Sequence, residues 1–456
     1  MLWLIVKKEI LSNFVNFRIL TSFVLFVGLI TTSTVLSVTD YSARMQDYTT
    51  RTREHKRAFR DALAQKDVGD RLWYVLYYGL YYDLKPAELG TLCRGLEEKL
   101  PSSFHARNFI GGMAGIRLFR ETGKPSRSLY ENPLLILYPT PDFVYIISII
   151  ASLAALFFAF DSLCGERLDG TLKLMLANPV PRYKVILAKW LGGYTSLMAP
   201  YFIACLGVIG VLMVSKTIGP SKETLYRIAG LVAVGGIYLG LFFSLGLLIS
   251  SRVRAPSASL LWCLFVWLLL TIFIPCLAPV VTKVAMPLPR EPRIKFFRKD
   301  WYRSIRRMDD PRLAEMPEYT PEEEIDLQRI ESFKKIRASQ AEFCIQLSRL
   351  SPAAIFTYIA SELTETGPAY YERVRSADEN FGSEYYRFTV TVGAKDISEK
   401  LSGADVMKEA WPQFRLSKIS LRDTISAILP DILILIISNI AVFLGGFLSF
   451  LKMDVA

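Results

Sequence analysis

The sequence predicts an α-helical polytopic membrane protein with six transmembrane helices and two large, mainly helical external insertions, one after span one and one after span five. Hydrophobic residues make up 52% of its 456 residues, and the mean hydropathy is +0.29. Such a composition excludes a purely soluble globular class. Six uncharged or nearly uncharged runs have the length of about 20 apolar residues that a membrane-spanning helix needs.

These runs divide the chain into alternating spans and connecting segments. The predicted boundaries are an interfacial helix 1–16, span one 17–38, external segment one 39–142, span two 143–163, a cytoplasmic helix and turn 164–185, span three 186–214, a short external loop 215–227, span four 228–250, a cytoplasmic loop 251–257, span five 258–281, external segment two 282–425, span six 426–451 and a tail 452–456. The alternative for the first run is a cleaved signal peptide. Its length and the lack of a small-residue cleavage site favour an uncleaved anchor.

The basic residues predict the orientation. Lys7 and Lys8, the loop after span two, Arg252 with Arg254, and Lys452 all fall on one side when the six spans alternate. Basic residues are retained on the cytoplasmic side, so both termini are expected there, in a bacterial cytoplasmic (inner) membrane. Basic flanks also account for the net charge of +11 without a nucleic acid partner. The chain has no N-x-[ST] glycosylation acceptor, which agrees with a bacterial origin.

Within the external segments, local patterns predict individual elements. A charged stretch over about 41–67 is expected to be helical, and the aromatic-rich Leu72–Leu84 is expected to be a strand. Pro321 suits the first position of a long helix that runs to about Leu350, and a second helix is expected over 352–365. Tyr385–Val392 is expected to be a strand because of its β-branched and aromatic residues.

The sequence lacks the machinery of an enzyme. It has no P-loop, no nucleophile elbow, no metal-binding Cys spacing, and only two histidines, His55 and His105, neither in a metal-binding arrangement. No metal site and no catalytic residue is therefore predicted. A six-span membrane protein without an energy-supplying domain of its own needs an ion gradient or a separate subunit that supplies the energy.

Several other polar residues have two interpretations each. Cys93 and Cys344 lie one in each external segment and are candidates for a disulfide, with two unpaired thiols as the alternative. Asp161 and Asp431 lie near span ends, where exposure to water is favoured over an ion site. The candidate pathway residues are Thr31, Thr32, Ser33 and Thr34 of span one with Asn439 of span six, although an interhelical hydrogen bond is favoured for Asn439.

The stretch Gly165–Arg182, GERLDGTLKLMLANPVPR, lies between spans two and three. Leu168, Leu172, Met175 and Leu176 recur at helical spacing and share one face, and Asn178-Pro179 ends the helix. A short amphipathic helix held between two spans lies along the membrane surface. It can receive a soluble partner there, or it can rest on lipid headgroups.

The motifs of this stretch resemble those of ABC transporter type-2 permease subunits. They are Glu166, Gly170-Thr171-Leu172, Pro179-Val180-Pro181-Arg182 and Lys189, although Ala188 replaces a frequent glycine. Leu350-Ser351-Pro352 with Thr366-Gly367, and the ending Phe450–Val455, are similar to a branch related to permeases of nitrous-oxide-reductase maturation and gliding-motility systems.

This resemblance implies a permease that pairs with a second permease copy, identical or related, and docks a dimer of ABC ATPase subunits. ATP and Mg²⁺ would be bound by that partner, and no cofactor by this chain. The helix after span two would be the coupling helix. Its implied coupling residues are Glu166, Arg167, Leu168, Asp169, Gly170, Thr171, Leu172, Met175, Leu176, Pro179 and Arg182. Met1–Asn16 would be an interfacial helix.

The motifs and the large external segments together suggest three functions. The first is an ATP-driven exporter. The second is a mechanotransmitter whose external segments act on a periplasmic protein without moving a substrate, which the size of those segments favours. The third is a receptor or scaffold without an ATPase, against which the motifs after span two argue.

Overall fold

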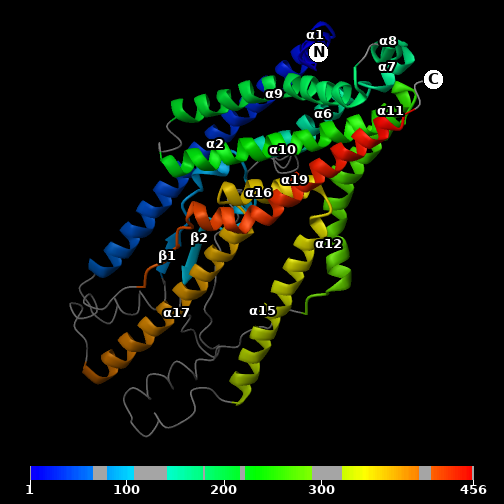
Figure 1. The fold of residues 1–456 in the computed structure, drawn as a ribbon. Helices are drawn as coiled ribbons and strands as arrows, with labels where there is room; N and C mark the ends of the chain where they lie inside the picture. The colour runs from blue at the N-terminus through cyan, green and yellow to red at the C-terminus, as the bar shows by residue number, and fades with distance from the viewer. Residues whose placement is uncertain are drawn as a thin grey trace.

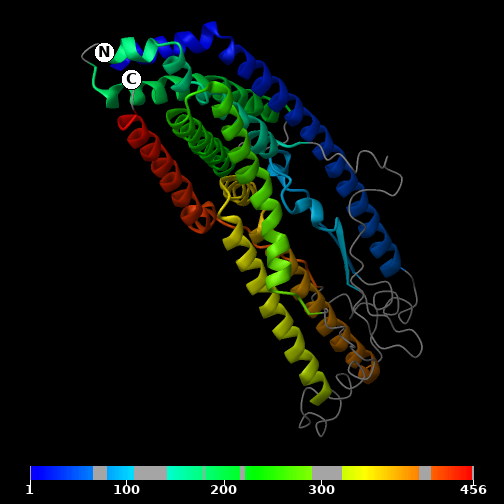
Figure 2. The ribbon, with the colours of Figure 1, turned by 90° about the vertical axis from the view of Figure 1, so that its right-hand side faces the viewer.

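The computed structural model describes residues 2–64, 80–106, 141–177, 180–215, 221–289, 321–399 and 412–453. These residues form an elongated bundle of long helices (Figures 1 and 2). Helix α1 (Leu2–Val15), the short helices α7 and α8, and the C-terminus gather at one end, called the terminal end below. The opposite end, the distal end, carries a small two-stranded sheet and the long helices α15 and α17.

Six helical stretches of the described chain are long and apolar enough to cross a membrane, which confirms the predicted fold class. They are α2 (Arg18–Ala64), α5 (Phe143–Tyr145) with the π-helical η3 (Ile146–Ala151) and α6 (Ser152–Ala159), α9 (Arg182–Val214), α10 (Lys222–Arg252), α11 (Pro256–Leu268) with η4 (Leu269–Phe273) and α12 (Ile274–Ala285), and α19 (Leu421–Leu451).

Helix α2 continues far beyond the first span. It runs without a break for 47 residues and includes residues 41–64 of the charged stretch that was expected to be helical, while residues 65–67 lie outside the described residues. No glycine or proline occurs between Leu29 and Ala64, so nothing in the sequence interrupts the helix. At 1.5 Å per residue, α2 spans about 70 Å, from the terminal end to the distal end.

Helix α10 lies at the centre of the bundle. Of its apolar stretch 72% is buried, against 17% for α11–α12 and 17% for α19, and it packs against α19, α6 and α16. Glycines permit this contact: a Cβ at Gly246 would lie 2.8 Å from the Cβ of Ala159, and a Cβ at Gly240 would lie 3.0 Å from Nδ2 of Asn439. The exposed apolar faces of α11–α12 and α19 are left for lipid or another chain.

The distal elements are mainly helical, as predicted. Helix α15 (Pro321–Ser348) is followed by α16 (Pro352–Leu363), whose Phe356 and Ile359 are fully buried, and by α17 (Pro368–Glu399). Strand β1 (Leu80–Asp83) pairs antiparallel with β2 (Ser103–Ala106). The remainder of the predicted strand, residues 72–79, lies outside the described residues.

The predicted strand Tyr385–Val392 is wrong, because these residues belong to α17. Phe381, Tyr385 and Phe388 recur at helical spacing on α17 and are buried. Phe381 and Tyr385 form one cluster, against which Phe414 packs. The tertiary contact overrides the local β-propensity of the sequence.

A buried arginine joins the spans to the distal elements. Arg227 of α10 is 3% exposed and pairs with Glu365 at 2.9 Å and Glu223 at 3.0 Å. It also donates to the carbonyl oxygens of Leu363 and Ile419. This one guanidinium thereby holds the end of α16 and the segment before α19 against α10.

The close approach at Gly246 gives a test of the packing. Gly246→Ala should lower the free energy of unfolding by about 1–3 kcal/mol, because its methyl group overpacks α6 against α10. Gly210→Ala is the control, since a Cβ at Gly210 meets nothing within 4 Å. Thermal unfolding in detergent measures both, and equal melting temperatures would contradict the packing described here.

Candidate coupling site

The segment between spans two and three forms two short helices and not the single helix predicted. Helix α7 covers Cys164–Leu168 and α8 covers Thr171–Ala177, both at the terminal end (Figure 1). The break falls at Gly170, whose φ of +71° lies in the left-handed region. Glycine adopts this conformation without strain and commonly ends a helix in it.

The break divides the predicted apolar face. Leu172 is fully buried in a cluster with Val185, Ile186 and Phe450, against which Met175 and Leu176 pack. Leu168, expected on the same face, is 71% exposed, and Leu174 is 72% exposed. The buried leucine therefore anchors the segment to the permease itself. The surface open to a partner carries Leu168 and Leu174, with exposed Asp169, Thr171 and Lys173 around them.

A buried lysine holds α7 in place. Nζ of Lys189, on α9, lies 3.0 Å from Oε2 of Glu166 and 3.3 Å from Oε2 of Glu9, and its side chain is 1% exposed. Lys8 of α1 adds a further contact to Glu166 at 3.3 Å. Four charged groups from α1, α7 and α9 thus form one network, which we call the Lys189 network. A buried ammonium ion requires such partners, because losing water costs several kcal/mol.

Hydrogen bonds also join this segment to spans four and six. The Ser250 hydroxyl of α10 accepts hydrogen bonds from the backbone N–H groups of Leu163 and Cys164, at 3.0 and 3.2 Å. These bonds satisfy donors at the start of α7 that have no intrahelical acceptor. Arg182 donates to the carbonyl oxygens of Leu451 and Met453, at the end of α19.

Both aspartates at the span ends form ion pairs. Arg18 of α2 donates two hydrogen bonds to the carboxylate of Asp161. Asp431 of α19 is 1% exposed and accepts two hydrogen bonds from Arg349. The prediction that Asp431 is exposed to water is therefore wrong. A carboxylate at the end of an apolar run needs either water or a cation, and the fold supplies the cation.

Helix α1 lies beside the coupling segment. Its large apolar residues Trp3, Leu4 and Phe14 are exposed, as an interfacial helix requires. Its other face packs against α9, where Gly192 permits close approach: a Cβ there would lie 2.7 Å from the Cβ of Glu9. Asn13 donates to Ser196 across the same contact.

The remaining candidate residues are not brought to the coupling segment. Thr34 donates to the carbonyl oxygen of Ile30 and Ser33 to that of Pro141, while Thr31 is half-buried and Thr32 exposed. Asn439 accepts from Ser244 at 2.9 Å and donates to the carbonyl oxygen of Ile237, so it links α19 to α10. This is the interhelical bond favoured for Asn439.

Cys93 and Cys344 are both free thiols in the structure. Cys93 is buried, and burial raises its pKa to about 12. Pro179 lies outside the described residues. In the ranges that the structure covers, no three His, Cys, Asp or Glu side chains are placed to hold a metal ion.

Comparison with known proteins identifies the family. The family described as ABC-2 family transporter protein matches residues 3–455. The chain belongs to this family. No curated protein matches it significantly. As an ABC-2 family member it is a multi-pass membrane subunit of an ABC system, and an ABC ATPase is its general partner.

Sequence reasoning missed three parts of this ABC-2 permease's coupling segment. The exposure of Leu174 could not be predicted from helical spacing, because the spacing was counted for one continuous helix and the break at Gly170 changes which residues share a face. Lys8 and Glu9 were assigned only to a lipid-facing helix. Lys189 carried a usable signal, since an ammonium group inside an apolar helix implies a carboxylate partner.

Removing the buried cation tests the Lys189 network. Lys189→Met leaves Glu9 and Glu166 without their shared partner, so the free energy of unfolding should fall by about 3–5 kcal/mol. Limited proteolysis should also cut within 164–177 sooner. Lys184→Met, a half-buried lysine on the same helix, should change neither measurement. Equal melting temperatures for the two variants would count against the network.

Proposed function

We propose that this permease subunit belongs to an exporter-type ABC transporter, and that its segment 164–177 receives the motion of a separate ATPase dimer. One observation carries the proposal: two leucines, Leu168 and Leu174, are more than 70% exposed on a segment that is otherwise anchored. Exposed apolar side chains on a fixed frame are typical of a protein interface whose anchors fill pockets on the partner.

The anchors give the motion a route. A displacement of α7 is transmitted to α1 and α9 through the Lys189 network, and to α10 through Ser250. A displacement of α8 is transmitted through Leu172 to Phe450 of α19. Spans two, three, four and six therefore receive one push together. Asp169 and Lys173 lie beside the exposed leucines, where charged partners on the ATPase would set register and association rate.

The proposal also includes the orientation of the chain in the membrane and the subunits of the transporter. The basic residues at the terminal end support an orientation with both termini and the coupling segment in the cytoplasm of a bacterium and the chain in its inner membrane. ATP and Mg²⁺ are then bound by the ATPase subunits. A second permease copy, identical or related, would complete the transporter, and the exposed apolar faces of α11–α12 and α19 offer it contact surface.

Three leucines of one segment provide the test. Leu168→Ala and Leu174→Ala should each weaken ATPase binding about tenfold, with unchanged melting temperature, because each loses an interface anchor. Leu172→Ala is the matched control: it should lower the free energy of unfolding by about 2–5 kcal/mol, because it empties a buried position. Co-purification with the cognate ATPase and thermal unfolding measure the two effects. ATPase affinity unaffected by both exposed variants would contradict the coupling surface.

A second function, mechanotransmission to a periplasmic protein, is favoured by α2. This single helix runs from the Arg18–Asp161 pair to the distal sheet, where Arg44 contacts Glu97 and His55 lies 2.9 Å from Asp83 of β1. A stiff rod joined at both ends can pass movement across a membrane without opening a path.

Reconstitution separates the two functions. With the cognate ATPase in proteoliposomes, export gives ATP-dependent movement of a substrate. Mechanotransmission gives ATP-dependent binding of an external protein to the distal elements and no flux. In both cases Leu174→Ala should reduce the ATP-dependent signal at subsaturating ATPase concentration, whereas a signal independent of ATP would contradict both.

A further inference from the structure

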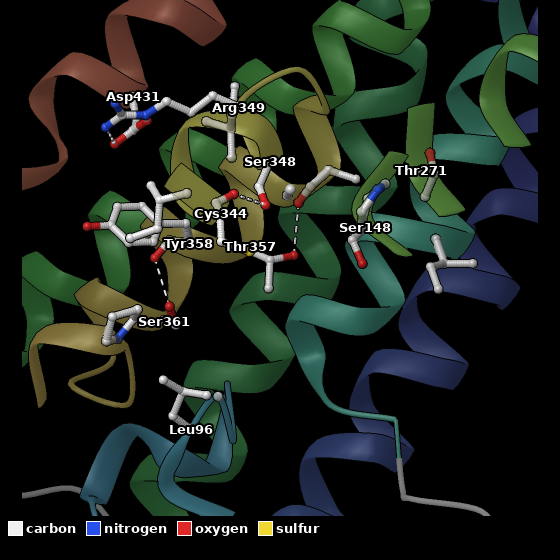
Figure 3. A pocket seen from close by; sticks show the side chains of 18 residues that line it. Leu96, Ser148, Thr271, Cys344, Ser348, Arg349, Thr357, Tyr358, Ser361 and Asp431 are labelled. Atoms are coloured by element: carbon white, nitrogen blue, oxygen red, sulfur yellow. Dashed lines mark hydrogen bonds and ion pairs between the residues drawn. The ribbon is translucent and has the colours of Figure 1, made fainter. Parts of the chain in front are cut away.

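A cavity of about 470 Å³ lies between spans two, five and six, the last turns of α15 and α16, where the spans meet the distal elements (Figure 3). Ligand pockets are typically about 300–1,000 Å³, so this volume suits a small molecule or part of a larger one. Much of the lining is apolar, from residues such as Leu96, Ile149, Pro275, Ile345 and Ala354.

The charged group of this cavity is the guanidinium of Arg349. Its Nε and Nη2 donate to the Asp431 carboxylate at 2.7 and 3.0 Å, and its Nη1 donates to Gln346 at 3.1 Å. Three of the five N–H groups of an arginine are thereby used, and no acceptor among the described residues takes the other two. Asp431 is 1% exposed, whereas the Arg349 side chain is 27% exposed. Both residues line the cavity, and the arginine is the more exposed partner of the pair.

The hydroxyl groups of the lining add to this preference. Ser348, Thr357 and Ser361 each donate to a carbonyl oxygen three or four residues earlier in their own helix, so their protons are already used (Figure 3). The Tyr358 hydroxyl has no partner within the described part of the chain. The Thr271 hydroxyl, also in the lining, is buried and has no hydrogen-bond partner among the described residues. The donors left for a ligand thus come from Arg349, Tyr358 and Thr271, and they suit an acceptor-rich, anionic group.

The depth of the cavity indicates the rest of the ligand. Asp431 directly precedes Ile432–Leu451, an uncharged run that covers about 30 Å as a helix, the thickness of the hydrocarbon core. Ser148, another lining residue, lies within the first two turns of span two. The cavity therefore lies at the distal boundary between headgroups and acyl chains. A ligand at this depth has both a polar and an apolar part.

We propose that this distal cavity binds an amphiphile with an anionic head, a phosphate or a carboxylate, that pairs with Arg349, while its apolar chain lies along Ile149, Pro275 and Ile345. Binding at this site requires no ATPase. Only the further step, that the bound amphiphile is the exported substrate, rests on the proposed function. Arg349 with Tyr358 holds the head, and Asp431 fixes the position of the guanidinium through two hydrogen bonds.

The test uses the full chain in nanodiscs of phosphatidylcholine, without the ATPase, and a photoreactive analogue of dodecyl phosphate as the probe. Peptide mapping after irradiation should place the label on the cavity-lining part of 344–361. Unlabelled dodecyl phosphate should compete for the site, whereas uncharged dodecyl maltoside and inorganic phosphate should not. Competition by the maltoside as strong as that by dodecyl phosphate would overturn the anionic head, and equal competition by inorganic phosphate would overturn the apolar chain.

Two variants remove the site by independent means. Arg349→Gln combined with Asp431→Asn deletes the cation without leaving a buried carboxylate unpaired, and Thr357→Trp fills the cavity from an exposed position. Each should reduce labelling about tenfold or more. Arg337→Gln, on α15 outside the cavity, is the matched control and should label as the parent does. Unchanged labelling in both site variants, with parental melting temperatures, would overturn the proposal. Because no ATPase is present, that result would leave the coupling proposal standing.

Discussion

The terminal end of this permease depends on one buried charge. Lys189 lies inside an apolar helix with 1% of its side chain exposed, and it stays charged there because Glu9 and Glu166 share it. The free energy of dehydrating an ammonium ion is recovered only when its partners keep their geometry. Helices α1, α7 and α9 are therefore tied at one point, and the position of the segment 164–177 follows from that requirement. On a mobile loop the exposed leucines of this segment would have no fixed position at which a partner could contact them.

The distal end repeats this arrangement with arginine. Arg227 holds the end of α16 and the segment before α19, and Arg349 holds Asp431 of α19. Burial lowers the pKa of Arg373, close to Arg227, whereas hydrogen bonds and charge from Asp431 raise the pKa of Arg349, and both guanidinium groups stay charged. Between the two ends, α10 forms an apolar centre in which glycines permit close helix contact. The structure is thus an apolar middle closed at each boundary by a small number of ion pairs, and both proposed sites lie at those boundaries.

The relation between α2 and the rest bears on the choice between the two functions. A transporter needs relative movement of its spans, and the anchors of α7 and α8 reach spans two, three, four and six. Span one packs against α9 and pairs with span two through Arg18, but it differs from the other spans because it continues as the same helix to the distal sheet. The two functions therefore use different helices of one bundle. A chain with both features can move its distal elements whether or not a substrate passes.

The sequence by itself determined the number of spans, the helical character of the distal elements, the family motifs and the place of the segment between spans two and three. These follow from composition, apolar run length and local spacing, which need no knowledge of neighbours. Only the tertiary structure decided which leucine of 164–177 is buried, that Tyr385–Val392 is helical and that Asp431 is paired. Each of these depends on a contact between residues far apart in the chain. The left-handed turn at Gly170 separates Leu168 from Leu172, and the cation that neutralises Asp431 comes from a helix 82 positions earlier.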